Sequence, residues 1–232
     1  MITIPKAFSG PPGTGNGGYV CGSLAGHISG PAEVTLNVPC PLDTPLSVVE
    51  HADRAALMHG DIEVATGKLS FPDIRARDAI SFDQAVAASG DFSGFQYHPY
   101  PGCFVCGTDL AEGDGLRIYA GRVQGQKNVV AAPWLPHKNH ADAEGLIEDK
   151  MIWSALDCPG AFTVMGEEET PMLLGRLGVQ IFGRPSVGEP CVVQGWLEEK
   201  EGRKVMVGTG LYGEDGNLLA VGKATWILAK QE

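Results

Sequence analysis

One acidic residue stands out because of its apolar surroundings. Asp157 follows the apolar segment 151–156 and comes two residues before Pro159, in a stretch that is typical of a buried helix. A carboxylate is unfavourable there unless it reaches solvent or has a function. Asp157 is therefore either an exposed acid near a helix end or a general base or nucleophile.

A glycine-rich loop at residues 10–18 is the second feature with chemical potential. It resembles a nucleotide-binding P-loop, but Asn16 and Gly17 replace the lysine and the Ser or Thr that would contact phosphates and magnesium. The loop leads into an expected helix over 17–27, and amides at a helix N-terminus can hold negative charge. The amides of Gly17 and Gly18 are therefore candidate donors to a ligand carbonyl or an oxyanion.

Cys103 and Cys106 form a Cys-x-x-Cys pair, with His98 five residues earlier. A structural zinc site needs four ligands, commonly from two such pairs, and the sequence holds no second pair. His137 and His140 would complete a set only if the fold brought them over. We expect a tight turn with two ordinary thiols, with no metal ligands and no cofactor.

Composition narrows the class of protein. Of the 232 residues, 44% are hydrophobic and 19% charged, with a formal net charge of −11. This is an ordinary globular composition, and the negative charge disfavours nucleic acid and anionic membranes as partners. No targeting segment or membrane span is visible, and six cysteines do not make a disulfide scaffold. We expect a cytoplasmic protein.

An internal repeat indicates how the chain is organised. Segment 34–49 aligns without gaps onto 179–194, and segment 64–69 aligns onto 219–224. Each copy reads as an alternating strand, a turn with proline and a second strand, followed later by another strand. The pattern predicts antiparallel strands in both halves.

A helical stretch precedes the strands in each half. The expected helix over 148–161 matches the one over 17–27, and this alignment places Asp157 opposite Ala25. A helix followed by long antiparallel strands predicts a sheet wrapped around that helix. Two such units can cover their exposed strand edges by packing edge to edge.

The repeat divides the chain into two expected units. The N-terminal unit covers residues 1–95, including a linker from about residue 71 that is rich in Gly, Pro, Asp and Ser. The C-terminal unit covers residues 96–232.

Three segments carry a resemblance to a known family. Residues 175–185, 188–193 and 215–224 resemble the sheet of hotdog-fold acyl-CoA thioesterases of the phenylacetate-pathway type. Asn16, Gly17 and Gly18 resemble the His-Gly-Gly that opens the central helix in that family. The resemblance implies an α+β fold, a double hotdog with two antiparallel sheets, each wrapped around a central helix.

The resemblance also implies a catalytic site. Hotdog sites combine the glycine-led helix start of one unit with the acid on the helix of its partner. Asp157 would be the catalytic acid, the amides of Gly17 and Gly18 would hold an oxyanion, and Asn16 would orient substrate or water.

The second inter-unit site lacks both the acid and the glycine-led helix start. Its acid position is Ala25, and its helix start carries Glu148 in place of the motif. One site is therefore expected to work. Tyr19 and Trp153, which adjoin the motif and the acid on the two helices, are the candidate substrate-binding residues.

The leading hypothesis is an acyl-CoA or other acyl thioester hydrolase, with a small-molecule acyl thioester as partner. A non-catalytic acyl- or CoA-binding hotdog protein is the alternative, because Asn16 replaces the usual histidine. A hydratase or dehydratase ranks third, because the sequence lacks an Asp-x-x-x-x-His arrangement. No Gly-x-Ser-x-Gly motif supports a serine hydrolase, and assembly into a homo-oligomer is left open.

Overall fold

The computed structural model describes residues 1–165 and 171–229. The acidic run at 167–169, which the sequence places in a solvated loop, lies outside these residues. None of the described helices is long and apolar enough to cross a membrane.

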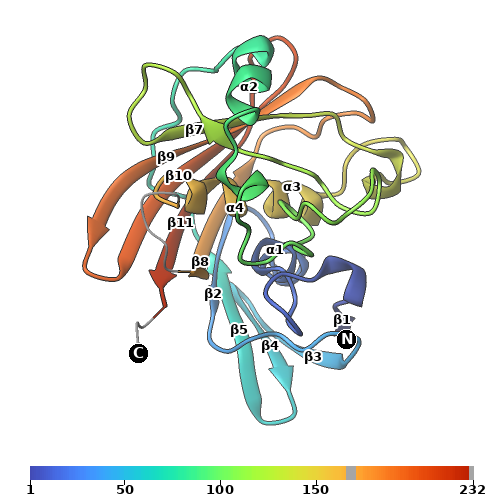
Figure 1. The fold of residues 1–232 in the computed structure, drawn as a ribbon. Coiled ribbons are helices and arrows are strands. Elements are labelled where there is room, and N and C mark those ends of the chain that lie inside the picture. Colours follow the sequence, from blue (N-terminus) through green and yellow to red (C-terminus); the bar gives the residue numbers. More distant parts are fainter. Residues whose placement is uncertain (166–170, 230–232) are drawn as a thin grey trace.

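An 11-stranded sheet forms the body of the molecule (Figure 1), in the order β1-β3-β4-β5-β2-β8-β11-β10-β9-β7-β6. Neighbouring strands pair antiparallel. The strands of the first half are β1 (Ile2–Thr3), β2 (Ala32–Leu36), β3 (Pro45–His51), β4 (Arg54–His59) and β5 (Ile62–Leu69). Those of the second half are β6 (Gly121–Arg122), β7 (Val129–Trp134), β8 (Met172–Ile181), β9 (Cys191–Glu201), β10 (Lys204–Tyr212) and β11 (Leu218–Leu228).

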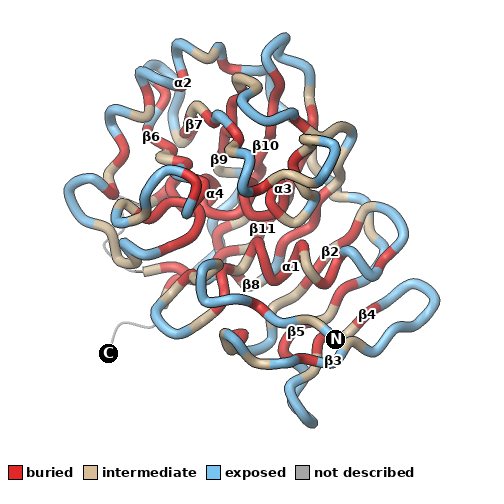
Figure 2. Tube along the Cα trace, turned by 90° about the vertical axis from the view of Figure 1, so that its right-hand side faces the viewer, coloured by how far each residue is buried: buried red, intermediate tan, exposed pale blue. Residues whose placement is uncertain are grey.

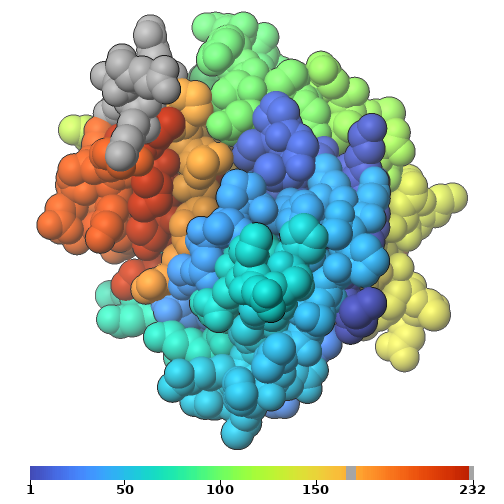
Figure 3. All heavy atoms as spheres, turned by 90° about the horizontal axis from the view of Figure 1, so that it is seen from below, coloured from blue at the N-terminus to red at the C-terminus, as the bar shows by residue number. Residues whose placement is uncertain are grey.

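The two halves have the same internal order of strands. The order β3-β4-β5-β2 in the first half is matched by β9-β10-β11-β8 in the second. The halves meet where β2 pairs with β8, with Val34 opposite Leu177, and Figure 3 shows the first half (blue to cyan) beside the orange and red strands of the second. The expected α+β double hotdog is confirmed, but its two expected sheets are halves of one continuous sheet. The β2–β8 pairing explains this, because it covers two strand edges that would otherwise be open.

The helices differ in what they cover. Helix α1 (Gly17–Ala25) packs on β2, β4 and β5, and it also contacts α3 (Asp149–Ala155). Helix α4 (Cys158–Phe162) packs on β7, β9 and β10, and α2 (Phe82–Ser89) covers β6 and β7. Three 3-10 turns complete the elements: η1 (Lys6–Phe8), η2 (Ser93–Phe95) and η3 (Lys138–His140). Figure 2 shows that buried residues gather in α1, α3, α4 and the strands around them.

The single helix expected over 148–161 is wrong, because the chain breaks between α3 and α4. Pro159 has no N–H to donate to the carbonyl of Ala155, so the helical ladder stops there. The carbonyl of Leu156 instead accepts a hydrogen bond from Thr209 Oγ1 at 2.9 Å. Asp157 lies at the break with a non-helical backbone, φ −80° and ψ −84°.

Two glycines of α1 let the central helices approach each other closely. A Cβ atom on Gly18 would lie 2.7 Å from Asp157 Cβ and 2.8 Å from the carbonyl oxygen of Trp153. A Cβ atom on Gly22 would lie 2.7 Å from the Cα of Lys150. Because real side chains do not tolerate such distances, the contact between α1 and α3 requires glycine at both positions.

The expected linker after residue 71 lies along the second half of the sheet. Tyr212 donates a hydrogen bond to the carbonyl of Arg77 at 2.6 Å, and Gln194 donates one to the carbonyl of Asp78 at 3.1 Å. The division at residues 95 and 96 stays a prediction.

Candidate active site

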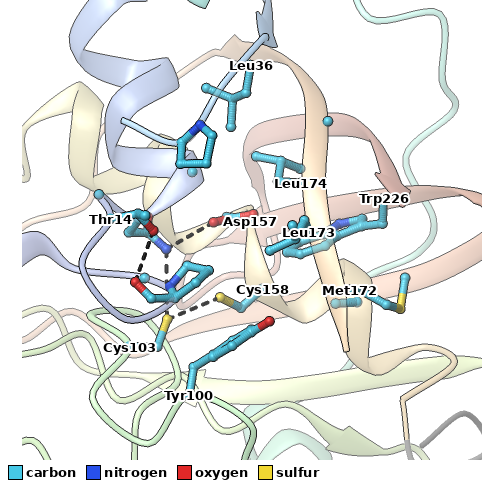
Figure 4. A pocket seen from close by; sticks show the side chains of 18 of the residues that line it. Thr14, Leu36, Tyr100, Cys103, Asp157, Cys158, Met172, Leu173, Leu174 and Trp226 are labelled. Carbon is cyan, nitrogen blue, oxygen red and sulfur yellow. Dashed lines mark hydrogen bonds between the residues drawn. The ribbon is translucent and has the colours of Figure 1, made fainter. Parts of the chain in front are cut away.

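A cavity of about 360 Å³ opens where the start of α1, the break between α3 and α4 and the start of β8 meet. Both halves of the chain line it, and its size falls within the usual range for small-molecule sites. Neither Lys nor Arg is among its lining residues in the described part of the chain. Its walls are mainly apolar, formed by Val20, Leu36, Val38, Met165, Met172 and Leu174. Figure 4 shows Asp157 among these side chains, with the sulfurs of Cys103 and Cys158 nearby.

Asp157 is the buried acid of this cavity and is only 1% exposed. Its Oδ2 accepts hydrogen bonds from the amide of Gly18 at 2.9 Å and from Asn16 Nδ2 at 3.0 Å, whereas its Oδ1 is buried without a partner. Desolvation by burial is the main cause that raises the pKa of Asp157 to about 7, although the bond from Gly18 acts against it. Asp157 thus lies against the start of α1, and its catalytic role stays a prediction.

Asn16 has a different position from the one expected. It is 2% exposed, and its Oδ1 caps α1 by accepting a hydrogen bond from the amide of Tyr19 at 2.9 Å. Its Nδ2 donates to Asp157 and, at 3.9 Å, to the sulfur of Cys103. Its polar atoms are therefore engaged within the protein, including a bond to the carboxylate of Asp157, and it also lines the cavity. A role in orienting substrate or water stays a prediction.

The two glycines of the motif are not equivalent. Because the amide of Gly18 donates to Asp157, it is not free to hold an oxyanion, contrary to expectation. Gly17 lines the cavity, and within the described residues its amide donates no hydrogen bond. Trp226 Nε1 is a second unpartnered donor in a residue that lines the cavity. Trp226 is not among the site residues predicted from the sequence, because its strand pattern predicts only a core residue.

Tyr19 and Trp153, expected to bind substrate, do not line the cavity. The ring of Tyr19 stacks on Phe8 with centroids 3.9 Å apart, and Trp153 packs against Gly22. Both side chains are buried because they lie beside the tight contact between α1 and α3. They belong to the core of that contact.

The second inter-unit position has neither the acid nor the glycine-led helix start. Position 25 is alanine, and Glu148 at the start of α3 forms an ion pair with Lys150 at 2.6 Å. Glu148 also makes no side-chain cap of α3. The two copies therefore differ in the way that their aligned residues predict.

A third thiol, which the sequence pattern does not predict, lies beside Cys103 and Cys106. Cys158 Sγ lies 3.7 Å from Cys103 Sγ, and the three sulfurs lie within 4.8 Å of one another, all buried. Cys158 reaches this position because it follows the break at Asp157. His98 lines the same cavity, whereas His137 and His140 do not.

Comparisons with known proteins agree with the architecture. No protein-family model matches the chain, and no curated protein matches it. A protein from Novosphingobium aromaticivorans, described as a candidate thioesterase, superposes over 99% of this chain and 94% of its own, with a TM-score of 0.61 at 13% identity.

Two single-unit structures are also similar. The PaaI protein of the E. coli phenylacetic acid degradation operon covers 63% of this chain and 96% of its own, with a TM-score of 0.49 at 6% identity. Zebrafish thioesterase superfamily member 2 covers 65% of this chain and 100% of its own, with a TM-score of 0.46 at 12% identity. From its own strand order and from the match along its whole length, the chain has the hotdog fold, with two units fused in one polypeptide.

Proposed function

We propose that this protein hydrolyses acyl thioesters, with acyl-CoAs as the substrate class, at a single site between its two units. The observation that carries the proposal is the buried Oδ1 of Asp157. Among the described residues this atom has no hydrogen-bond partner. Asp157 lines an apolar cavity together with Gly17, whose amide donates no hydrogen bond in the described chain. A base and an oxyanion donor in one cavity are the two groups that hydrolysis of a thioester requires.

The chemistry follows from these two groups. Asp157 takes a proton from water as the water oxygen attacks the thioester carbonyl, and the amide of Gly17 stabilises the oxyanion that forms. When the tetrahedral intermediate collapses, the carbon–sulfur bond breaks and the thiolate leaves with the proton that Asp157 held. The products are a carboxylic acid and a free thiol.

The lining of the cavity supports an orientation for the substrate. Apolar residues from both halves form its walls, and no Lys or Arg in the described chain lines it. The acyl group therefore fits inside, whereas the phosphates of a CoA carrier stay outside. The candidate thioesterase from Novosphingobium aromaticivorans, which shares the architecture along the whole chain, supports the same reaction class.

A hydrolysis screen tests the proposal. Wild type and Asp157→Asn are incubated with acyl-CoAs of different chain length and with aromatic acyl-CoAs, and the released thiol is measured. We expect turnover of at least one class by the wild type and loss of that turnover in the variant. Tight binding of acyl-CoA without release of thiol would instead support the acyl-binding alternative.

A further inference from the structure

The three thiols beside Asp157 are not used in the proposed hydrolysis. Cys103 and Cys106 come from a loop that precedes β6, whereas Cys158 begins α4. All three are free, buried and line the cavity. Their sulfurs lie within 4.8 Å of one another, so two separate parts of the chain converge on one point.

The loop that holds Cys103 and Cys106 has a tight turn. The amide of Gly107 donates to the carbonyl of Cys103 at 2.8 Å, and a Cβ atom on Gly107 would clash with that carbonyl. This Cys-x-x-Cys-Gly turn brings the two sulfurs close together, which suits a shared metal ion.

The spacing of the sulfurs suits a tetrahedral ion. Two thiolates bound to zinc at about 2.3 Å are separated by about 3.8 Å. Cys103 Sγ and Cys158 Sγ are 3.7 Å apart, and no pair in the cluster exceeds 4.8 Å. Side-chain shifts of about 1 Å or less would therefore close the cluster around one ion.

The charges around the cluster favour a cation. Asp157 Oδ1 is buried without a partner, and Asn16 links the carboxylate of Asp157 to the sulfur of Cys103. No Lys or Arg in the described chain lines the cavity to balance these acidic groups. Buried anionic groups are costly unless they are paired or bind a metal.

We propose that Cys103, Cys106 and Cys158 bind one zinc ion through three thiolates, with the fourth coordination position open to the cavity. His98 does not complete the set, because its Nδ1 accepts a hydrogen bond from the amide of Tyr100 at 3.0 Å. In the neutral ring the proton is then on Nε2, which leaves no free lone pair for a metal. A site with three protein ligands and an open position is the arrangement of catalytic rather than structural zinc.

The experiment measures metal content and is independent of the proposed hydrolysis. The full chain is purified under reducing conditions, loaded with zinc, freed of excess metal and analysed for elements. We expect about one zinc per chain. Replacement by Co²⁺ should give the thiolate-to-cobalt charge-transfer band and the strong visible absorption of a tetrahedral site, which reports sulfur ligands without any mutation.

Cysteine-to-serine variants assign the ligands. Cys103→Ser, Cys106→Ser and Cys158→Ser should each lower retained zinc to about a tenth or less. Cys40→Ser is the matched control, since Cys40 is buried and lines the same cavity but is not in the cluster. It should retain the metal, and circular dichroism checks that each variant is folded.

Three results would overturn the proposal. The first is wild type that retains less than about a tenth of an equivalent of zinc after loading. The second is a Co²⁺ spectrum without thiolate charge transfer. The third is a disulfide within the cluster in place of a bound ion, found by mass spectrometry of protein kept under reducing conditions.

Discussion

The amide of Gly18 donates a hydrogen bond of 2.9 Å to Oδ2 of Asp157, a residue 139 positions later in the sequence. This bond joins the start of α1 to the break between α3 and α4, and therefore the two halves of the chain. It fixes one carboxylate oxygen, whereas Oδ1 is buried and has no hydrogen-bond partner among the described residues. The glycine motif thus holds the acid in place, and the amide of Gly17 is the oxyanion donor that we propose.

The first prediction concerns Gly18 and Gly22. Replacing either by alanine should lower the free energy of unfolding, because the new Cβ would lie 2.7 Å from atoms of the opposing segment. Such overpacking costs about 1–3 kcal/mol, more than the roughly 1 kcal/mol that alanine gains from helix propensity. Only Gly18→Ala should also reduce turnover strongly, because only Gly18 contacts Asp157. Chemical denaturation and kinetics of both variants test this.

Gly26→Ala is the control for these two variants. Gly26 follows α1 with φ −58°, and the nearest atom to its added Cβ would be 3.7 Å away. Stability should be unchanged or slightly higher. Equal loss of turnover in Gly18→Ala and Gly22→Ala would contradict a specific role for Gly18.

The second prediction separates the two contacts of Asn16. Asn16→Ser keeps an oxygen that can cap α1, but it loses the donor to Asp157 Oδ2. Turnover should fall with little change in stability. Asn16→Ala loses both contacts and should cost a further ~1 kcal/mol in unfolding free energy. Full activity in Asn16→Ser would show that the amide does not position Asp157.

Much of the fold could be predicted from patterns that are local in the sequence. The strands β8 to β11 are long, and turns at Gly202 and Gly216, where φ is positive, separate β9 from β10 and β10 from β11. The alignment of segment 34–49 with 179–194 predicts the equivalence of β2 with β8 and of β3 with β9. These features can be predicted from the sequence because strand and turn preferences depend on neighbouring residues.

The site is harder to predict because it depends on contacts between distant residues. The apolar segment before Asp157 predicts a continuous helix. The hydrogen bond from Thr209 to the carbonyl of Leu156, which stabilises the break in that helix, is a tertiary contact that the local sequence does not predict. That break also brings Cys158 to Cys103. Tyr19 is a substrate candidate in the sequence because it adjoins Gly18, but adjacent residues on a helix point in different directions.

The third prediction concerns the break itself. Thr209 Oγ1 donates to the carbonyl of Leu156, and both residues are fully buried. Thr209→Val keeps the shape but leaves that carbonyl without its donor, which should cost about 1–3 kcal/mol of unfolding free energy. Ser154→Ala is the control, because Ser154 Oγ donates to the carbonyl of Lys150, which the helix also uses. Ser154→Ala should therefore lower the free energy of unfolding clearly less than Thr209→Val does. Denaturation of both variants measures this difference.

The fourth prediction concerns stability at alkaline pH. Desolvation by burial, followed by the charge of Asp78, raises the pKa of Tyr212 to about 12. The folded protein therefore keeps the phenol protonated when the unfolded chain, with a pKa near ~10, has already lost the proton. The stabilisation of the folded protein by this protonated phenol is complete below about pH 10. As the pH rises towards about 12 it is lost, which lowers the free energy of unfolding by up to about 2 kcal/mol once solvent screening is allowed for.

Tyr212→Phe isolates this contribution from other groups. The variant loses the bonds to Arg77 and Gln194, so it should be less stable than wild type at about pH 8 by about 1–3 kcal/mol. The difference should narrow between about pH 10 and about pH 12, since wild type alone loses the phenol contribution. A constant difference across this range, in denaturation series at several pH values, would contradict the assignment.

The last prediction is that only one of the two inter-unit positions is active. Asp157 lines the cavity together with Gly17, and its Oδ1 has no partner among the described residues, whereas the equivalent position in the first half is Ala25. At the other helix start, Glu148 is paired with Lys150 at 2.6 Å. Asp157→Asn should lower turnover by about 10²–10⁴-fold, the usual contribution of a general base, while Glu148→Gln should keep most of it. The two substitutions are matched in chemistry, because each replaces a carboxylate by its amide. Comparable losses in both would mean that the proposed site is not the site of reaction, and full activity in Asp157→Asn would remove the acid from the mechanism.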